Sequence, residues 1–166
     1  MKIVKDIVHY FAVACYVLIT IYGIVCIPSI FGYRPLIVLT GSMEPTYKVG
    51  SIIYYKKVSK EELKIGDAIT FKLSDGSYVS HRINSIKGDK YVTKGDANNS
   101  VDANPVSYVN IVGRDSKFSI PILGYFIKIV NDNLYFIVFI IAILIAEFIL
   151  GSVNEKKGSD IIVIQE

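Results

Sequence analysis

A serine stands between glycine and methionine in GSMEPT, residues 41–46, shortly after a long apolar run. A serine hydroxyl is a weak nucleophile unless a neighbouring base removes its proton during the attack. The chain holds two histidines, His9 and His81, and His9 lies within the apolar run. His81, in the stretch VSHRI, is therefore the candidate general base for an acyl transfer with Ser42 as nucleophile.

Such a site also needs an acid that fixes the tautomer of the base. The loop TKGDANNSVDAN, residues 93–104, holds two aspartates, Asp96 and Asp102. A histidine in a strand commonly serves packing, and an aspartate in a loop commonly serves a turn. Together, however, Ser42, His81 and Asp102 supply every role of a Ser-His-Asp triad.

Two apolar runs, 7–27 and 134–150, lie on either side of these residues. The first has about the 20 residues that a spanning helix needs, and the second is marginal but sufficient with its flanking residues. We therefore expect an N-terminal transmembrane anchor over 1–28 and a C-terminal transmembrane helix over 133–151. A cleaved signal peptide for the first run and a buried core helix for the second are the alternatives.

Lysines lie outside both runs, at positions 2, 5, 156 and 157. Because the cytoplasmic flanks of membrane helices carry an excess of lysine and arginine, we expect both termini in the cytoplasm. The segment 29–132 is then extracytoplasmic, and 152–166 is a short cytoplasmic tail. Tyr47, Ile52 and Phe118 are candidates for apolar side chains that enter the lipid leaflet.

Composition and charge narrow the function classes. Hydrophobic residues make up 52% of the 166-residue chain, which is high for a soluble protein and typical of the membrane class. The formal net charge of +3 is small, and the lysines form no dense basic block, which argues against a nucleic-acid partner. The two cysteines form no zinc or redox pattern, and nothing else in the sequence offers a metal site.

Short β-branched or aromatic runs fill the segment 29–132. Turn sequences such as KIGD, SDG and KGDK separate them. Several short strands at close spacing favour an antiparallel arrangement over alternating strands and helices. We predict a mainly β fold, an antiparallel β-sandwich or partly open barrel, as one domain between the two transmembrane helices. The candidate strands are 35–40, 51–57, 68–73, 77–87, 90–94 and 110–118.

Three segments in order carry a family resemblance: GSMEPT followed by GSIIYY, then SHRI, then TKGDANNSVD followed by VGR. With a membrane anchor just before the serine, they resemble a type I signal peptidase over about residues 36–114. Most bacterial members of this family have a lysine where this chain has His81 before Arg82. The histidine is similar to the endoplasmic-reticulum and archaeal type, which also occurs in some Gram-positive bacteria.

The resemblance implies roles for three residues. Ser42 matches the nucleophile, and His81 matches the general base and acid. The oxyanion of the intermediate is expected to be held by the backbone N–H of Ser42 and by the hydroxyl of Thr40, where family members supply a second donor.

The resemblance also implies roles for the two aspartates. Asp102 matches the late aspartate of the family and is the first choice for orienting His81. Asp96 matches the earlier one and is a further candidate catalytic residue, expected to shape the loop through hydrogen bonds and to contact the site. The loop is one residue longer than the GDNN pattern of this branch, and Ala103 stands where a second adjacent aspartate often occurs. The division of labour between Asp96 and Asp102 therefore stays open.

By this resemblance the protein is a membrane-bound serine endopeptidase that cleaves signal peptides from secretory precursors at the outer membrane face. The membrane is the plasma membrane, or the endoplasmic reticulum in a eukaryote, and the expected partners are signal peptides, the lipid bilayer and a secretion translocon. Neither a metal nor an organic cofactor is needed. The alternatives are a catalytically inactive, membrane-anchored β interaction module and a Ser/Lys peptidase with Lys94 or Lys72 as the base.

Overall fold

The computed structural model describes the backbone of residues 2–163 and the side chains of residues 2–152. The chain divides into two compact units. Val25–Lys128 forms one unit, which we call the β unit. The residues before it and after it form the second, helical unit, and each unit is described by itself.

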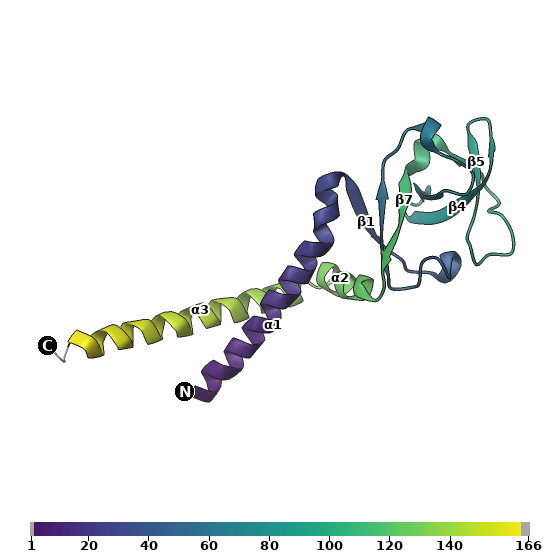
Figure 1. The fold of residues 1–166 in the computed structure, drawn as a ribbon. Helices are drawn as coiled ribbons and strands as arrows, with labels where there is room; N and C mark the ends of the chain where they lie inside the picture. Colours follow the sequence, from purple (N-terminus) through teal and green to yellow (C-terminus); the bar gives the residue numbers. More distant parts are fainter. Residues whose placement is uncertain (1, 164–166) are drawn as a thin grey trace. The chain divides into compact units, whose positions relative to one another are not determined.

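The β unit contains a seven-stranded antiparallel sheet with the strand order β1-β2-β7-β3-β4-β5-β6 (Figure 1). Within the described residues, all strands belong to one open sheet with β1 and β6 at its edges, which confirms the predicted antiparallel pairing. These strands form neither two stacked sheets nor a closed barrel. The strands are β1 (Tyr33–Ile37), β2 (Ile52–Lys56), β3 (Ala68–Lys72), β4 (Tyr78–Lys87), β5 (Lys90–Lys94), β6 (Val106–Ser107) and β7 (Ile111–Ile120). The 3₁₀ turn η1 (Ile27–Phe31) precedes β1, and three further 3₁₀ turns lie between strands: η2 (Gly41–Met43), η3 (Lys60–Glu62) and η4 (Tyr108–Asn110).

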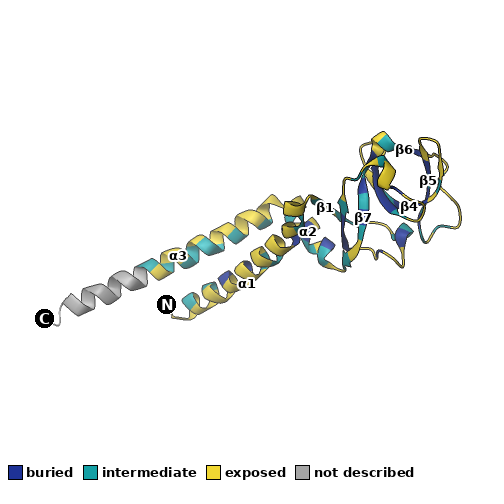
Figure 2. Ribbon diagram, turned by 45° about the horizontal axis from the view of Figure 1, so that its top comes forward, coloured by how far each residue is buried: buried dark blue, intermediate teal, exposed yellow. Residues whose placement is uncertain are grey.

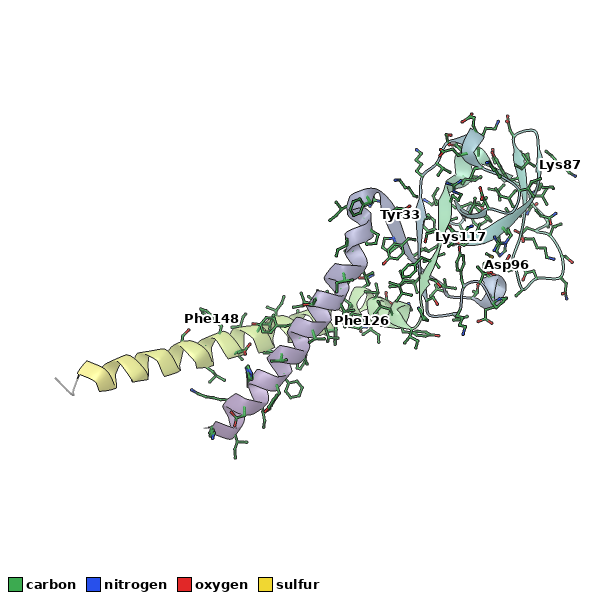
Figure 3. The ribbon with its side chains drawn as sticks, in the orientation of Figure 1. Tyr33, Lys87, Asp96, Lys117, Phe126 and Phe148 are labelled. Atoms are coloured by element: carbon green, nitrogen blue, oxygen red, sulfur yellow. The ribbon has the colours of Figure 1, made fainter. Side chains whose placement is uncertain are left out.

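The core of the β unit is built from buried strand residues, which Figure 2 shows gathered on the strands; they are consecutive in β2 and β3 and alternate in β5. In β4 and β5, Ile83, Tyr91 and Thr93 are buried while their sequence neighbours are more exposed, as expected when successive side chains point to opposite faces. Ile69 of β3 packs into the same cluster. Figure 3 shows Tyr33 of β1 and Lys87 of β4 at opposite ends of this unit.

Two residues that the sequence offered as candidates for entering the lipid leaflet belong to this core instead. Tyr47 packs with Met43 and Ile53, and Ile52 packs with Tyr54. Tyr47 and Ile52 are 2% and 0% exposed, so they are structural residues and the interpretation was wrong. Their burial follows from the tertiary packing of β2, which contains Ile52, and of the chain between β1 and β2, which contains Tyr47; local hydrophobicity does not reveal this packing.

The helical unit consists of long apolar helices. α1 (Lys2–Cys26) and α3 (Leu134–Val163) are 25 and 30 residues long, and the ten-residue α2 (Leu123–Asp132) links the β unit to α3. The description of the whole chain as mainly β is therefore too loose and holds only for the β unit.

In the part of the chain that the structure describes, two segments are long and apolar enough to cross a membrane: Lys2–Phe31 and Leu134–Ser152. No part of the apolar window in the second segment is buried, whereas the alternative, a core helix, would be mostly buried. His9 of the first is hydrogen-bonded to Glu147 of the second, with 2.9 Å between Nδ1 and Oε1. The side chains of Lys156 and Lys157, on which the predicted orientation partly depends, lie outside the described residues.

Candidate active site

Ser42 sits in the 3₁₀ turn η2, directly after the extended segment that follows β1. The side chain of the next residue, Met43, is 2% exposed and packs in the core with Tyr47 and Ile53. The backbone N–H groups of Glu44 and Tyr47 donate to the carbonyls of Gly41 and Met43, which closes the turn. The buried methionine thus holds the turn against the sheet.

His81 lies within β4, directly opposite Ile69 of β3, and is 8% exposed. Its Nε2 atom is 3.2 Å from the Oγ atom of Ser42, within hydrogen-bonding distance. The ring of Phe71 meets the imidazole edge-on, with 6.3 Å between the ring centroids. A regular strand and an aromatic neighbour therefore hold the imidazole beside the serine.

Asp102 occupies the other side of the imidazole. Its Oδ2 atom is 2.7 Å from Nδ1 of His81 and also accepts a hydrogen bond of 2.6 Å from the hydroxyl of Thr93. Because an ionised carboxylate only accepts hydrogen bonds, Nδ1 carries the proton in this arrangement and Nε2 presents its lone pair to Ser42. The structure thus brings Ser42, His81 and Asp102 into one continuous chain of contacts.

Asp96, the other candidate acid, is engaged elsewhere. Its two carboxylate oxygens accept hydrogen bonds of 2.8 and 2.6 Å from Nε and Nη2 of Arg82, and the hydroxyl of Thr46 lies 2.5 Å from Oδ2. The hydrogen bonds from Arg82 hold the pKa of the Asp96 carboxyl below its usual value, against the opposing effect of burial. Arg82 also donates to the carbonyl of Gly66, over 2.7 Å.

The arginine pair was not anticipated from the sequence, although its signal is visible there. Arg82 follows His81 in a strand, so its side chain points to the opposite face, and the β4–β5 register puts Arg82 opposite Lys94, two residues before Asp96. An arginine at this register position is within reach of the earlier aspartate of the loop. Thr93, the partner of Asp102, carries no such signal because a buried threonine is an ordinary strand residue.

The loop that carries both aspartates is tied to the backbone of the serine. The N–H of Ala97 donates to the carbonyl of Ser42, over 2.9 Å. Gly95 lies so close to the same carbonyl that a Cβ atom there would be 2.5 Å from the oxygen. This close approach requires a glycine, and it fixes the distance between the loop and the turn η2.

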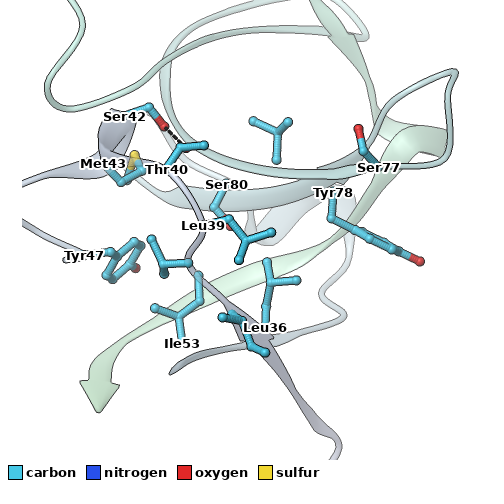
Figure 4. Close-up of a pocket in the computed structure, with 13 residues that line it drawn as sticks. Leu36, Leu39, Thr40, Ser42, Met43, Tyr47, Ile53, Ser77, Tyr78 and Ser80 are labelled. Carbon is cyan, nitrogen blue, oxygen red and sulfur yellow. Dashed lines mark hydrogen bonds between the residues drawn. The ribbon is translucent and has the colours of Figure 1, made fainter. Parts of the chain in front are cut away.

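Thr40, the predicted second oxyanion donor, lies beside Ser42. Its Oγ1 atom is 3.5 Å from the serine Oγ, a weak contact that leaves both hydroxyls free to turn toward a ligand (Figure 4). Ser42 Oγ thus has His81 and Thr40 as its hydrogen-bonding neighbours within the described residues. Neither Lys94 nor Lys72, the candidate bases of the Ser/Lys alternative, contacts the serine among them.

Ser42 and Thr40 line an apolar groove with a volume of about 420 Å³. One side consists of the end of β1 with the chain that follows it, and the other of the start of β4 (Figure 4). The groove is open to solvent and leads to the serine hydroxyl. Its lining residues are Leu36, Ile37, Val38, Leu39, Thr40, Ser42, Met43, Tyr47, Ile53, Ser77, Tyr78, Val79 and Ser80.

The chain is similar to known signal peptidases. Residues 10–97 match the family described as signal peptidase, peptidase S26. Signal peptidase I W of Bacillus subtilis is 37% identical over 134 residues, which cover 73% of this chain and 69% of the relative. Signal peptidase complex catalytic subunits SEC11 of Lodderomyces elongisporus and Scheffersomyces stipitis are 30% and 34% identical over 115 and 116 residues, each covering 61% of this chain and 68% of the relative.

The family match includes Ser42, His81 and Asp96, and the matched residues extend from α1 into the loop after β5. Ser42 lies beside His81 and lines an apolar groove, an arrangement suited to acyl transfer. The chain therefore belongs to the peptidase S26 family and is a serine peptidase of the signal peptidase class.

Proposed function

We propose that this protein removes signal peptides from secretory precursors at the outer face of a membrane, with Ser42, His81 and Asp102 as its catalytic residues. One observation carries the proposal: the imidazole of His81 lies between Ser42 Oγ at 3.2 Å and Asp102 Oδ2 at 2.7 Å. This geometry supplies a base for the nucleophile and an acceptor for the proton on the other nitrogen of the base.

The reaction begins when Ser42 Oγ attacks the scissile carbonyl carbon and His81 Nε2 takes the hydroxyl proton. Collapse of the tetrahedral intermediate breaks the C–N bond, and His81 returns its proton to the leaving amine, which is the N-terminus of the mature protein. The signal peptide remains as an ester on Ser42. Water then attacks this ester, with His81 again as the base, and frees the signal-peptide carboxylate and the serine. Asp102 stays ionised throughout and stabilises the imidazolium.

The negative charge of each tetrahedral intermediate needs donors. The backbone N–H of Ser42 and the hydroxyl of Thr40 are the groups proposed for this role. The 3.5 Å contact between Thr40 and Ser42 supports it, since the threonine hydroxyl turns away from the serine at little cost. Removing one such donor typically costs about 3 kcal/mol of transition-state stabilisation.

The substrate is proposed to bind as an added strand in the groove. β1 is an edge strand, and β4 pairs with β5 only from Arg82 onward, so 78–81 has a sheet partner on one side alone. An extended peptide between these two segments gains main-chain hydrogen bonds, while its side chains enter the groove. The apolar lining of the groove is compatible with the short apolar side chains that the family resemblance implies for the cleavage site.

The location of the site follows from the two apolar segments. Ser42 lies fifteen residues after position 27, where the first predicted span ends, so at most about 50 Å of extended chain separates them. A precursor whose own apolar helix is still in the bilayer presents its cleavage segment within this distance of the membrane surface. We propose that both termini are cytoplasmic, and that the β unit meets substrate released into the lipid by a secretion translocon.

The proposal is tested by cleavage of a precursor by the full-length protein in liposomes. His81→Ala is expected to lose roughly 10⁴-fold or more in kcat, because the hydroxyl loses its base. Ser42→Ala should be equally inactive. A wild-type protein that cleaves nothing would favour the inactive interaction module. Survival of activity in His81→Ala, with its loss in Lys94→Ala or Lys72→Ala, would instead favour the Ser/Lys mechanism.

A further inference from the structure

Thr93 of β5 is fully buried beside the proposed catalytic residues, and none of the steps above uses it. We propose that Thr93 is a positioning residue, which holds the carboxylate of Asp102 in the orientation that keeps the His81 proton on Nδ1. This inference rests on the proposed Ser-His-Asp function. It concerns a threonine that touches no substrate atom and acts only through Asp102.

The register of the sheet puts Thr93 on the face where it is needed. Thr93 is paired with Ile83 across the β4–β5 ladder, and Ile83 lies two residues after His81 in β4. Residues two apart in a strand share a face, and so do directly paired residues, so the Thr93 side chain projects on the same side of the sheet as the imidazole. A residue one position earlier or later in β5 would point away.

Thr93 holds Asp102 at two points. The hydroxyl of Thr93 donates to Asp102 Oδ2 over 2.6 Å, and the backbone N–H of Asp102 donates to the carbonyl of Thr93 over 2.8 Å. The first contact fixes the rotation of the carboxylate, and the second fixes the backbone from which it projects. Both contacts are needed because Asp102 lies in a loop, where its side chain has many rotamers available.

The two donors meet on one oxygen. Oδ2 accepts from both Thr93 Oγ1 and His81 Nδ1, while the Asp102 side chain is still 24% exposed to solvent. Without the threonine hydroxyl, rotation of the carboxylate toward water competes with the contact to Nδ1. A His81 that has lost this acceptor carries its proton on Nε2 part of the time, and in that tautomer it cannot accept the proton of Ser42.

The test compares Thr93→Val with Thr93→Ser in the full-length protein. Valine keeps the shape but removes the donor, and we expect a loss of roughly 10- to 100-fold in kcat with little change in KM. Serine keeps a hydroxyl and is expected to recover kcat to within about threefold of the wild type. Thr70→Val is the matched control, because Thr70 is also a fully buried strand threonine that donates to a carboxylate, that of Asp115.

A second readout does not depend on activity. With ¹⁵N-labelled histidine, the two histidines of the chain give separate imidazole signals, which His9→Gln assigns. The wild type and Thr93→Ser should show His81 with its proton on Nδ1, whereas Thr93→Val should show an increased share of the Nε2–H tautomer. Thr70→Val should leave the His81 tautomer unchanged even where it lowers the stability of the fold.

The outcomes separate this inference from the proposed function. If Thr93→Val cleaves like the wild type and keeps the Nδ1–H tautomer while His81→Ala is inactive, the positioning role is wrong and the triad stands. If Thr70→Val alters the tautomer as much as Thr93→Val does, the effect is a general loss of packing and the inference also fails. If His81→Ala remains active, the proposed function itself is wrong.

Discussion

The β unit contains two threonine–aspartate pairs of nearly identical local chemistry and different surroundings. Thr93 donates to Asp102 over 2.6 Å, and Thr70 donates to Asp115 over 2.5 Å; both threonines are fully buried strand residues. Asp102 meets the imidazole of His81 with the same oxygen. Asp115 meets no base, and its Oδ2 atom has no hydrogen-bond partner within the described side chains.

Asp115 is buried, and the pKa of its carboxyl group therefore differs from that of a solvent-exposed aspartate. Burial raises the pKa of this carboxyl to about 6, even though hydrogen bonds from Thr70 and Ser80 act in the opposite direction. A threonine donor alone therefore does not offset the cost of burying a carboxylate. The catalytic role proposed for Asp102 depends instead on its contact with His81, which gains positive charge when it takes the serine proton.

The largest expected effect comes from making the same change in both pairs. Asp102→Asn should lower kcat by roughly 10⁴-fold, because an amide donates to Nδ1 and reverses the tautomer of His81. Asp115→Asn should keep kcat within about threefold, as its carboxyl has no part in proton transfer. Both are measured as precursor cleavage in liposomes. Equal losses of kcat in the two variants would show that the Thr93–Asp102 and Thr70–Asp115 pairs do not differ in their role in catalysis.

The second-largest effect on the rate is expected from a change in the packing of the loop that carries Asp102. Gly95→Ala puts a methyl group 2.5 Å from the carbonyl of Ser42, so the loop and the turn η2 must move apart. A shift of about 1 Å at the reacting groups typically costs on the order of 100-fold in rate. Gly23→Ala, where nothing lies within 4 Å of the new methyl group, is the control and should retain the wild-type rate. A fully active Gly95→Ala protein would mean that the loop does not set the geometry of the triad.

Substitution of Asp115 should affect the free energy of unfolding, whereas substitution of Asp102 should affect kcat. Its pKa rises from the ordinary 3.8 to about 6 on folding, so its contribution to stability is greatest below pH 3.8 and is lost as the pH rises through 6. The shift in pKa corresponds to on the order of 3 kcal/mol of unfolding free energy that has been lost at neutral pH. Asp115→Asn should therefore be at least as stable as the wild type at pH 8, and its stability should vary less between pH 4 and 6. Denaturant unfolding at several pH values measures this, and a strongly destabilised variant at pH 8 would show that the ionised carboxylate is well solvated.

The smallest effect is expected at Asp96, whose partner is Arg82. Asp96→Asn weakens a bidentate charged pair and should cost about 1–3 kcal/mol of unfolding free energy, with less than about a tenfold loss in kcat. Because the pKa of Asp96 is lowered in the fold, the stability that its charge contributes is fully present above its unfolded pKa and lost only as the pH falls through the folded one. The cost should therefore be constant between pH 5 and 8. A loss of kcat as large as that of Asp102→Asn would make Asp96 a second catalytic acid.

Part of this arrangement could be predicted from residue types and order. Ser42 and His81 stood out because the part of the chain outside the apolar runs contains one histidine, and the antiparallel strands were visible from alternating residues and turns. The choice between Asp96 and Asp102 was not visible, because it depends on the path of a loop with one extra residue. That path is set by contacts distant in sequence, such as the Ala97 N–H with the Ser42 carbonyl.

Neither the open sheet nor the contact between Thr93 and Asp102 could be predicted from the sequence, for a similar reason. Local propensity predicts strands, but closure depends on register, and β7 pairs with β2 and β3 through irregular registers at Ile53/Tyr55 and Thr70/Phe71. A threonine in a strand has the same sequence signature whether its hydroxyl donates to Asp102, which is proposed to be catalytic, or to Asp115.

The most direct test of the central claim is the pH dependence of kcat/KM for precursor cleavage by the full-length protein in liposomes between pH 5 and 10. If the imidazole of His81 accepts the Ser42 proton, the rate should fall at acid pH, because an imidazolium cannot accept that proton, and should no longer rise at the alkaline end of this range. A rate that continues to rise to pH 10 would require a lysine as the base and would contradict the account.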